Sequence, residues 1–294
     1  MTKLRIFLVV LVASAAAAFA LFRGARQPSH PPHDRLQIVS LAPSVTEILF
    51  ALGLGDHIVG VTDRCDYPRA AKAIERVSGF GTPNVEKLLA LSPDIVIACG
   101  LEKPDFAEVL RQAGIQVLNV QKGGYIAGFT DLFDAIQQIG EATGRSAEAQ
   151  QLVAGMQARL DAVAVRVGRF DDAQRPRVFV EIEESPLMTA GAGSFIDDLV
   201  GRAGGRNVAH EINSAYPRIN PEKVIAWNPE VILVAHSDHP GEAADRLARH
   251  IGWSGIAAVR DRRVIDDIDG DLLFRPGPRL VDGVKALVER IHPQ

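Results

Sequence analysis

Two segments of this chain match each other: Asn84-Val85-Glu86-Lys87-Leu88-Leu89-Ala90-Leu91-Ser92-Pro93-Asp94-Ile95-Val96-Ile97 and Asn220-Pro221-Glu222-Lys223-Val224-Ile225-Ala226-Trp227-Asn228-Pro229-Glu230-Val231-Ile232-Leu233. The Asn, Glu, Lys, Ala and Pro positions are identical, and every pair is separated by the same interval, 136 residues from Asn84 to Asn220. Each copy predicts a short helix behind an Asn cap, a break at Pro and a buried apolar strand. A unit that occurs once in each half of the chain predicts two lobes of similar design.

Short β-branched apolar runs alternate with helical patterns on both sides of this repeat. The first helix is expected to begin in a capping box, Ser44-Val45-Thr46-Glu47, and to stop at Gly53. In the second half, Ser194 opens a helix at a small-residue turn. Because such alternation is typical of parallel sheets covered by helices, we predict an α/β fold with two Rossmann-like lobes and mostly parallel sheets. The expected strands are 36–41, 58–62, 95–99 and 115–120 in the first half, and 177–182, 207–209, 231–235 and 263–265 in the second.

One long helical pattern lies between the two lobes. From Ser146 to Gly168, apolar residues recur at steps of three or four, and such a helix would span about 33 Å. The predicted organisation is a first lobe over 36–143, a linking helix within 144–170 and a second lobe over 171–294. Because open α/β sheets bind ligands beyond the carboxyl ends of their strands, we expect the ligand in the cleft between the lobes. A helical link also predicts limited opening and closing of that cleft.

The N-terminal residues predict export. Lys3 and Arg5 precede an apolar, Ala-rich stretch, so residues 1–22 are either a cleaved signal peptide or an N-terminal membrane anchor. A polar, Pro-rich tether follows at 23–35. We therefore expect the two lobes in the periplasm or at the extracytoplasmic face of a membrane.

Composition and motifs argue against several functions. The 294 residues are 47% hydrophobic and 23% charged, as in globular proteins, and a formal net charge of −4 without a long basic run disfavours a nucleic-acid partner. The turn Gly191-Ala192-Gly193-Ser194 lacks the third Gly of a dinucleotide fingerprint, and no Gly-x-Ser-x-Gly elbow occurs. The sequence His236-Ser237-Asp238-His239 suggests no third metal ligand. We predict no catalytic residue, no metal site and no enzyme activity.

The two cysteines, Cys65 and Cys99, follow two strands of the first lobe and are expected at the same rim. In an oxidising compartment, thiols that reach each other tend to form a disulfide. Two unpaired, half-buried thiols fit the sequence equally well, because geometry decides. A disulfide between Cys65 and Cys99 therefore stays open at this point.

Several distinctive motifs occur in order over residues 36–292. They are Ile38-Val39-Ser40-Leu41-Ala42-Pro43-Ser44-Val45-Thr46-Glu47, Cys65-Asp66-Tyr67-Pro68, the repeated Asn-x-Glu segment, Ala203-Gly204-Gly205-Arg206-Asn207 and Arg275-Pro276-Gly277-Pro278-Arg279. In this combination the chain resembles the class III periplasmic solute-binding proteins of ABC importers for cobalamin, haem and ferric siderophores. The second and last of these motifs resemble the cobalamin-binding branch most. The resemblance implies two α/β lobes joined by a backbone helix.

The same resemblance implies two docking residues. Members of this superfamily place one surface Glu on each lobe, where it engages an Arg-lined pocket of the permease dimer. The matching positions here are Glu86 and Glu222, the two Glu residues of the internal repeat. Without the resemblance, both would be assigned only to favourable electrostatics at a helix start.

The resemblance carries over to the ligand pocket less completely. Phe80 and Tyr216 match aromatic positions of the cobalamin-binding pocket, and Arg275 matches a basic one. Arg64 and Cys99 stand where the cobalamin-binding relative has a Tyr and a Trp, so the departures leave the ligand itself open.

Together these features predict a solute-binding protein that captures cobalamin, or a related corrinoid, and delivers it to the permease dimer of an ABC importer. It is expected to act as a monomer and to need no cofactor of its own. The alternatives are a haem or ferric-siderophore binding protein of the same superfamily and, from another class, a metal- or nucleotide-dependent α/β enzyme.

Overall fold

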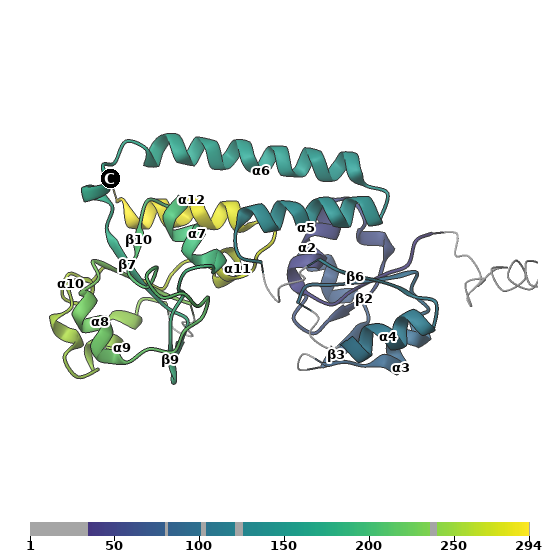
Figure 1. Cartoon of the computed structure of the whole chain (residues 1–294), viewed down its shortest axis with the longest axis horizontal. Coiled ribbons are helices and arrows are strands. Elements are labelled where there is room, and N and C mark those ends of the chain that lie inside the picture. The colour runs from purple at the N-terminus through teal and green to yellow at the C-terminus, as the bar shows by residue number, and fades with distance from the viewer. Residues whose placement is uncertain (1–34, 80–81, 101–103, 121–125, 236–239, 294) are drawn as a thin grey trace, which may run out of the picture.

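The computed structural model describes residues 35–79, 82–100, 104–120, 126–235 and 240–293. These residues form two α/β lobes side by side, with one long helix running along both (Figure 1). The expected signal or anchor segment, 1–22, lies outside the described residues, as does nearly all of the tether at 23–35. Within the described ranges, no helix combines the length and apolar character needed to cross a bilayer.

The sheet of the first lobe is parallel except at one edge. In the described part of the chain its strand order is β4-β3-β2-β1-β5-β6, and only β3 and β4 pair antiparallel. Successive residues of the central strands face opposite sides, so Ile38 contributes to the core beneath helices α2 and α5, and Val39 to the core beneath α3 and α4. The bounds are β1 Ile38–Ser40, α2 Pro43–Ala51, β2 Ile58–Thr62, β3 Arg76–Gly79, β4 Thr82–Pro83, α3 Val85–Leu91, β5 Ile95–Ala98, α4 Pro104–Gln112, β6 Gln116–Asn119 and α5 Phe129–Ala142.

The second lobe has a smaller sheet covered in the same way. Its described strands have the order β10-β7-β11-β12, all parallel, and the short hairpin β8–β9 stands apart. Val178 and Val180 belong to the core beneath α7 and α12, whereas Phe179 packs with α8, α9 and Trp253. The bounds are β7 Arg177–Glu181, β8 Glu183–Glu184, β9 Leu187–Met188, α7 Phe195–Arg202, β10 Arg206–Asn207, α8 Pro221–Trp227, β11 Val231–Val234, α9 Ala243–Ala248, α10 Ala257–Arg260, β12 Val264–Ile265, α11 Gly270–Phe274 and α12 Leu280–Ile291.

The internal repeat of the sequence is confirmed as a repeat of structure. Helices α3 and α8 correspond residue for residue, and so do the buried strands β5 and β11. Both helices end at a non-glycine residue in the left-handed region, Ser92 with φ 49° and Asn228 with φ 43°. Each left-handed residue precedes the Pro at which the chain turns into the strand. The local sequence therefore forms the same helix–turn–strand unit in both lobes.

The predicted linking helix is α6, Ser146–Val167, whose 22 residues correspond to about 33 Å. It runs along α5 of the first lobe and α12 of the second, so one element backs both lobes (Figure 1). Met156 and Leu160 lie on its buried face, whereas Val165 on the opposite face is 68% exposed.

Two local predictions were wrong. Strands β3 and β4 were not predicted, because they include Arg, Ser, Gly, Thr and Pro rather than an apolar run. The capping box at Ser44 does not form: α2 begins at Pro43, its N-cap is Ala42, and no side chain caps it. Glu47 thus does not cap the helix, and its carboxylate has a different partner. By contrast, Ser194 caps α7 as expected, accepting a hydrogen bond from the Asp197 amide at 3.1 Å.

Candidate functional site

Two adjoining cavities lie at the carboxyl ends of the first-lobe strands. One, of about 480 Å³, is bounded by residues that follow or end β1, β2 and β3: Leu41, Pro43, Thr62, Asp63, Arg64 and Ser78, with Pro83 beside them. The other, of about 580 Å³, lies between the lobes, with Pro43, Ser44 and Arg64 on one side and Ala235, Asp269, Gly270, Asp271, Phe274, Arg275 and Pro276 on the other. Pro43 and Arg64 line both. The two cavities therefore form one cleft, in the place where parallel α/β sheets bind ligands.

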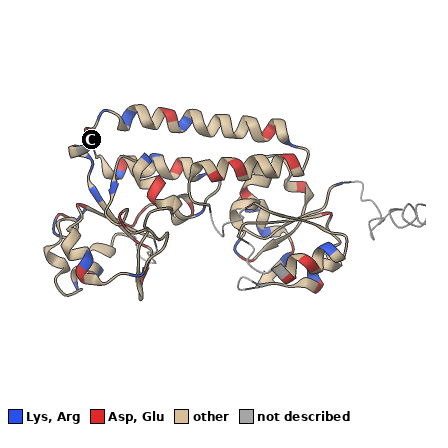
Figure 2. Cartoon of the chain, viewed as in Figure 1, with Lys and Arg blue, Asp and Glu red and all other residues tan. Residues whose placement is uncertain are grey.

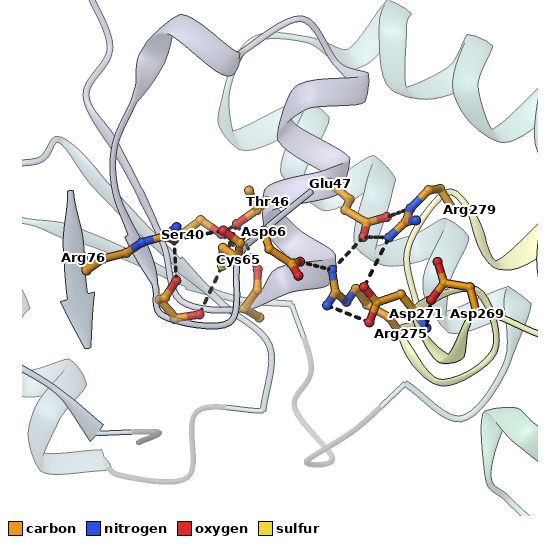
Figure 3. Close-up of polar contacts among 12 residues, drawn as sticks. Ser40, Thr46, Glu47, Cys65, Asp66, Arg76, Asp269, Asp271, Arg275 and Arg279 are labelled. Carbon is orange, nitrogen blue, oxygen red and sulfur yellow. Dashed lines mark hydrogen bonds and ion pairs between the residues drawn. The ribbon is translucent and has the colours of Figure 1, made fainter. Parts of the chain in front are cut away.

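A buried carboxylate of the first lobe holds two arginines of the second (Figure 3). Glu47 is 4% exposed. Arg279 grips it in bidentate fashion, with Nε donating to Oε2 at 3.0 Å and Nη2 to Oε1 at 2.7 Å. Arg275 Nη1 donates to Oε1 at 3.3 Å. Such charge-assisted pairing satisfies a carboxylate that would otherwise be costly to bury.

Arg275 contacts two more carboxylates at the edge of the cleft. Its Nη1 donates to Asp66 at 2.8 Å, and its Nη2 lies 2.8 Å from Asp271. Partial burial would raise the pKa of Asp66, but the hydrogen bond and charge of Arg275 outweigh it and hold that pKa below its ordinary value. Burial dominates at Asp271 and raises its pKa, despite the opposing charge of Arg275. Arg275 is thus surrounded by three carboxylates.

The two motifs that favoured the cobalamin-binding branch meet at this cluster. The Cys-Asp-Tyr-Pro segment supplies Asp66 and Tyr67, and the Arg-Pro-Gly-Pro-Arg segment supplies Arg275 and Arg279. The Arg279 guanidinium lies 3.7 Å from the centroid of the Tyr67 ring, a cation–π contact. The two motifs are therefore two halves of one contact between the lobes.

The sequence-predicted pocket residues lie in different surroundings. Arg64 is exposed and lines both cavities, and Arg275 lines the one between the lobes. Tyr216 and Cys99 are half-buried, pack against the hydrophobic core and line neither of these two cavities. Phe80 lies outside the described residues.

Both cysteines are free thiols in this structure. Cys65 is buried, and its Sγ lies 3.1 Å from the hydroxyl oxygens of both Thr46 and Thr62. Burial raises the pKa of the Cys99 thiol. Of the two arrangements that the sequence left open, the structure has the unpaired one.

The two repeat carboxylates, Glu86 and Glu222, are exposed in the first turns of α3 and α8. Both helices lie on the side of their lobes away from α6 (Figure 1). The Lys next to each Glu pairs elsewhere, Lys87 with Glu75 and Lys223 with Glu211, each at 3.2 Å. Among the described residues, neither repeat Glu forms an ion pair. Figure 2 shows these charged helices at the lower side of each lobe. Both carboxylates thus remain available to a partner.

Comparisons with known proteins identify the family. The periplasmic binding protein family model matches residues 38–269. The chain belongs to this family. It is 35% identical over 261 residues to an uncharacterized ABC transporter substrate-binding lipoprotein of Bacillus subtilis, covering 87% of this chain and 80% of that protein. It is therefore a binding protein and not an enzyme.

Two solved structures illustrate the range of ligands among its relatives. The periplasmic vitamin B12-binding protein of Vibrio cholerae superposes with a TM-score of 0.73 at 29% identity, covering 88% of this chain and 98% of that one. A periplasmic heme-binding protein from Pseudomonas aeruginosa superposes with a TM-score of 0.75 at 29% identity, covering 88% of this chain and 93% of that one. The predicted class III fold, two α/β lobes with a backbone helix, is confirmed, but likeness alone does not choose between these ligands.

Sequence reasoning missed the residue at the centre of the cluster. Glu47 was assigned to a helix cap, and Arg279 is the N-cap of α12. Glu47 and Arg279 are 232 residues apart, so no local pattern indicates that they pair. The one indication in the sequence was that Glu47 and Arg279 each end a motif that the chain shares with the class III binding proteins.

Proposed function

We propose that this protein captures cobalamin, or a related corrinoid, outside the cytoplasm and delivers it to an ABC importer. The observation that carries the choice of ligand is the charge of the cleft. Among its described lining residues, Arg64 is the one cation without an ion pair, since Arg275 is held by three carboxylates. Asp63, Asp269 and Asp271 also line the cleft.

This arrangement suits a ligand rich in uncharged amides. A corrinoid carries amide side chains, which accept from a guanidinium and donate to carboxylates. Haem carries two propionates, and many ferric siderophores are anionic, so either would bring negative charge to a cleft whose described lining residues include three carboxylates and two cations. Burying such like charges together is unfavourable. A vitamin B12-binding protein of Vibrio cholerae is 30% identical to this chain over 259 residues, so a corrinoid lies within the range of ligands that its relatives bind.

The proposed partner is a permease dimer in the cytoplasmic membrane. Glu86 and Glu222 offer one exposed carboxylate on each lobe, at matching positions of the repeat and without an ion-pair partner in the described part of the chain. A dimeric receptor presents the same pocket twice, and an Arg in each pocket would grip one carboxylate. Export of the monomeric protein, directed by the segment 1–22, would bring it to the permease dimer.

The test is a titration of the chain from about Ser29 onward with cobalamin, haem and a ferric siderophore in separate experiments. We expect cobalamin to bind at micromolar concentration or below, and the other two to bind at least ten times more weakly. Haem or siderophore binding alone would replace the ligand assignment with the alternative, and binding of none of the three would overturn it.

Two matched variants connect the binding to this cleft. Arg64→Met removes the unpaired cation and should weaken cobalamin binding about 3- to 10-fold, as expected for one hydrogen bond to a neutral group. Arg69→Met removes an exposed cation a few residues along that lines neither cavity, and should leave affinity unchanged. Equal effects of both variants would place the ligand elsewhere.

A further inference from the structure

The Glu47 cluster joins the lobes at the wall of the cleft. Glu47 lies in α2 of the first lobe, one turn after Ser44, which lines the cavity between the lobes. Arg275, which contacts Glu47, lines the opposite side of that cavity. Among the described residues, both partners of the buried carboxylate belong to the second lobe, so these bonds to Glu47 exist only while the lobes stay together. Separating them would expose or strand a charge, which is costly.

Hydrogen bonds within the first lobe connect the segments that carry its half of the contact (Figure 3). Arg76 Nη1 donates to the carbonyl oxygens of Thr62 at 2.8 Å and Cys65 at 2.9 Å, which fixes the turn that carries Asp66. The Thr46 hydroxyl, next to Glu47 in sequence, donates to Cys65 Sγ at 3.1 Å and ties α2 to the same turn. These bonds connect the two first-lobe segments that carry the carboxylates, namely α2 with Glu47 and the turn after β2 with Asp66.

The second lobe presents its arginines on an equally constrained loop. Pro276 and Pro278 fix two backbone angles between Arg275 and Arg279. Gly277 lies against the carboxylate: a Cβ at this position would be 3.2 Å from Glu47 Oε2. The loop therefore fits closely around Glu47, and a shift of one lobe against the other would break several charge-assisted bonds together.

We propose that Glu47 is a positioning residue for ligand binding: it binds Arg275 and Arg279 of the second lobe to the first lobe and so sets the width of the cleft. This inference rests on the proposed function in one respect, namely that the cleft is the ligand site. The linking helix α6 keeps the lobes connected, and the Glu47 contact fixes their separation at the ligand. In the ligand-free protein the cleft then already has its binding width, so that little ordering is required when the ligand enters.

The experiment measures the distance between the lobes directly. Fluorescent labels introduced as non-natural amino acids at Ala73 and Ala248, both exposed and one on each lobe, report it by single-molecule energy transfer. In the ligand-free protein, Glu47→Gln should lengthen and broaden the distance distribution relative to the unsubstituted chain. Cobalamin should restore the narrow distribution, with a dissociation constant about ten times higher than that of the unsubstituted chain.

A matched control distinguishes an effect on the distance between the lobes from a general loss of stability. Asp282→Asn makes the same chemical change at another carboxylate paired with an Arg, Arg159 of the linking helix, but at an exposed site. It should leave distance and affinity unchanged. Arg279→Lys keeps the charge, loses the bidentate geometry and should broaden the distribution less than Glu47→Gln; it also serves as the test if Glu47→Gln does not fold.

An unchanged distance distribution in Glu47→Gln or, if that variant does not fold, in Arg279→Lys overturns the proposal, whatever happens to the melting temperature. Because the distance between the lobes is measured without ligand, it tests the role of the Glu47 contact even if cobalamin does not bind. Absence of cobalamin binding to the unsubstituted chain would instead refute the proposed function.

Discussion

Replacing Glu86 and Glu222 by Gln removes one negative charge from each lobe at almost constant shape. Both side chains are exposed, and neither has an ion-pair partner among the described residues, so folding should lose little in either variant: the unfolding free energy should change by less than about 0.5 kcal/mol. The whole effect is expected in the complex with the importer. A hydrogen bond between charged groups contributes about 1.5–3 kcal/mol, which corresponds to about a 10- to 150-fold loss of affinity for each single variant.

The two sites lie on different lobes and share no contact, so their effects should add. The double variant Glu86→Gln/Glu222→Gln should bind the importer about 100- to 20,000-fold more weakly. The assay is equilibrium binding of ligand-loaded protein to its cognate importer in lipid nanodiscs, at low and at high salt. Glu141→Gln, an exposed carboxylate on α5, is the control and should bind normally.

Three results would refute this reasoning. A loss of ligand affinity in the double variant would place these carboxylates in the pocket or the fold. A change of less than threefold in importer affinity would show that docking does not depend on them. Equal weakening by Glu141→Gln would indicate a general effect of net charge.

Other predictions concern stability, pH and the thiols. A Cβ on Gly191 would lie 2.3 Å from a backbone carbonyl oxygen, so Gly191→Ala should lower the unfolding free energy by about 1–3 kcal/mol in urea titrations. Gly155 in α6 meets nothing within 4 Å, and Gly155→Ala should raise that free energy by about 0.5–1 kcal/mol. Burial lowers the pKa of His292 below 6.5, so the unfolded chain binds a proton at this side chain more readily than the folded chain does. The stability contributed by neutral His292 is therefore fully present above pH 6.5 and is lost as the pH falls through the lowered pKa. Unfolding of His292→Phe should lack this part of the pH dependence, and an identical profile would contradict the assignment. A thiol assay in denaturant without reductant should find two free thiols, Cys65 and Cys99; none would mean that they are bridged.

The sequence was most informative where structure depends on neighbours along the chain. Strand β2 has the predicted bounds, and the linking helix ends one residue before the predicted Gly168. Apolar periodicity and the Pro and Gly breaks are local signals, and burial of the resulting faces leaves few alternatives. Strands β3 and β4 were missed because backbone pairing with a neighbour, rather than their side chains, makes them strands.

The failed capping box shows the limit of local reasoning. Ser44 and Glu47 have the spacing of that motif, yet Pro43 is the first residue of the helix, and the N-cap is Ala42, two residues before Ser44. Glu47 then lies beyond reach of the helix start. Its partners are decided by the other lobe, which local sequence does not describe.

The sequence by itself determined the two similar lobes, the helix between them and the pair of repeat carboxylates, because each follows from a pattern within a few dozen residues or from direct comparison of two segments. Only the tertiary structure decided that Glu47, Asp66, Arg275 and Arg279 form one cluster and that Arg64 is left to face the cleft. These pairings join residues more than 200 positions apart, and the free energy of burying their charges together depends on distances that exist only once both lobes have folded.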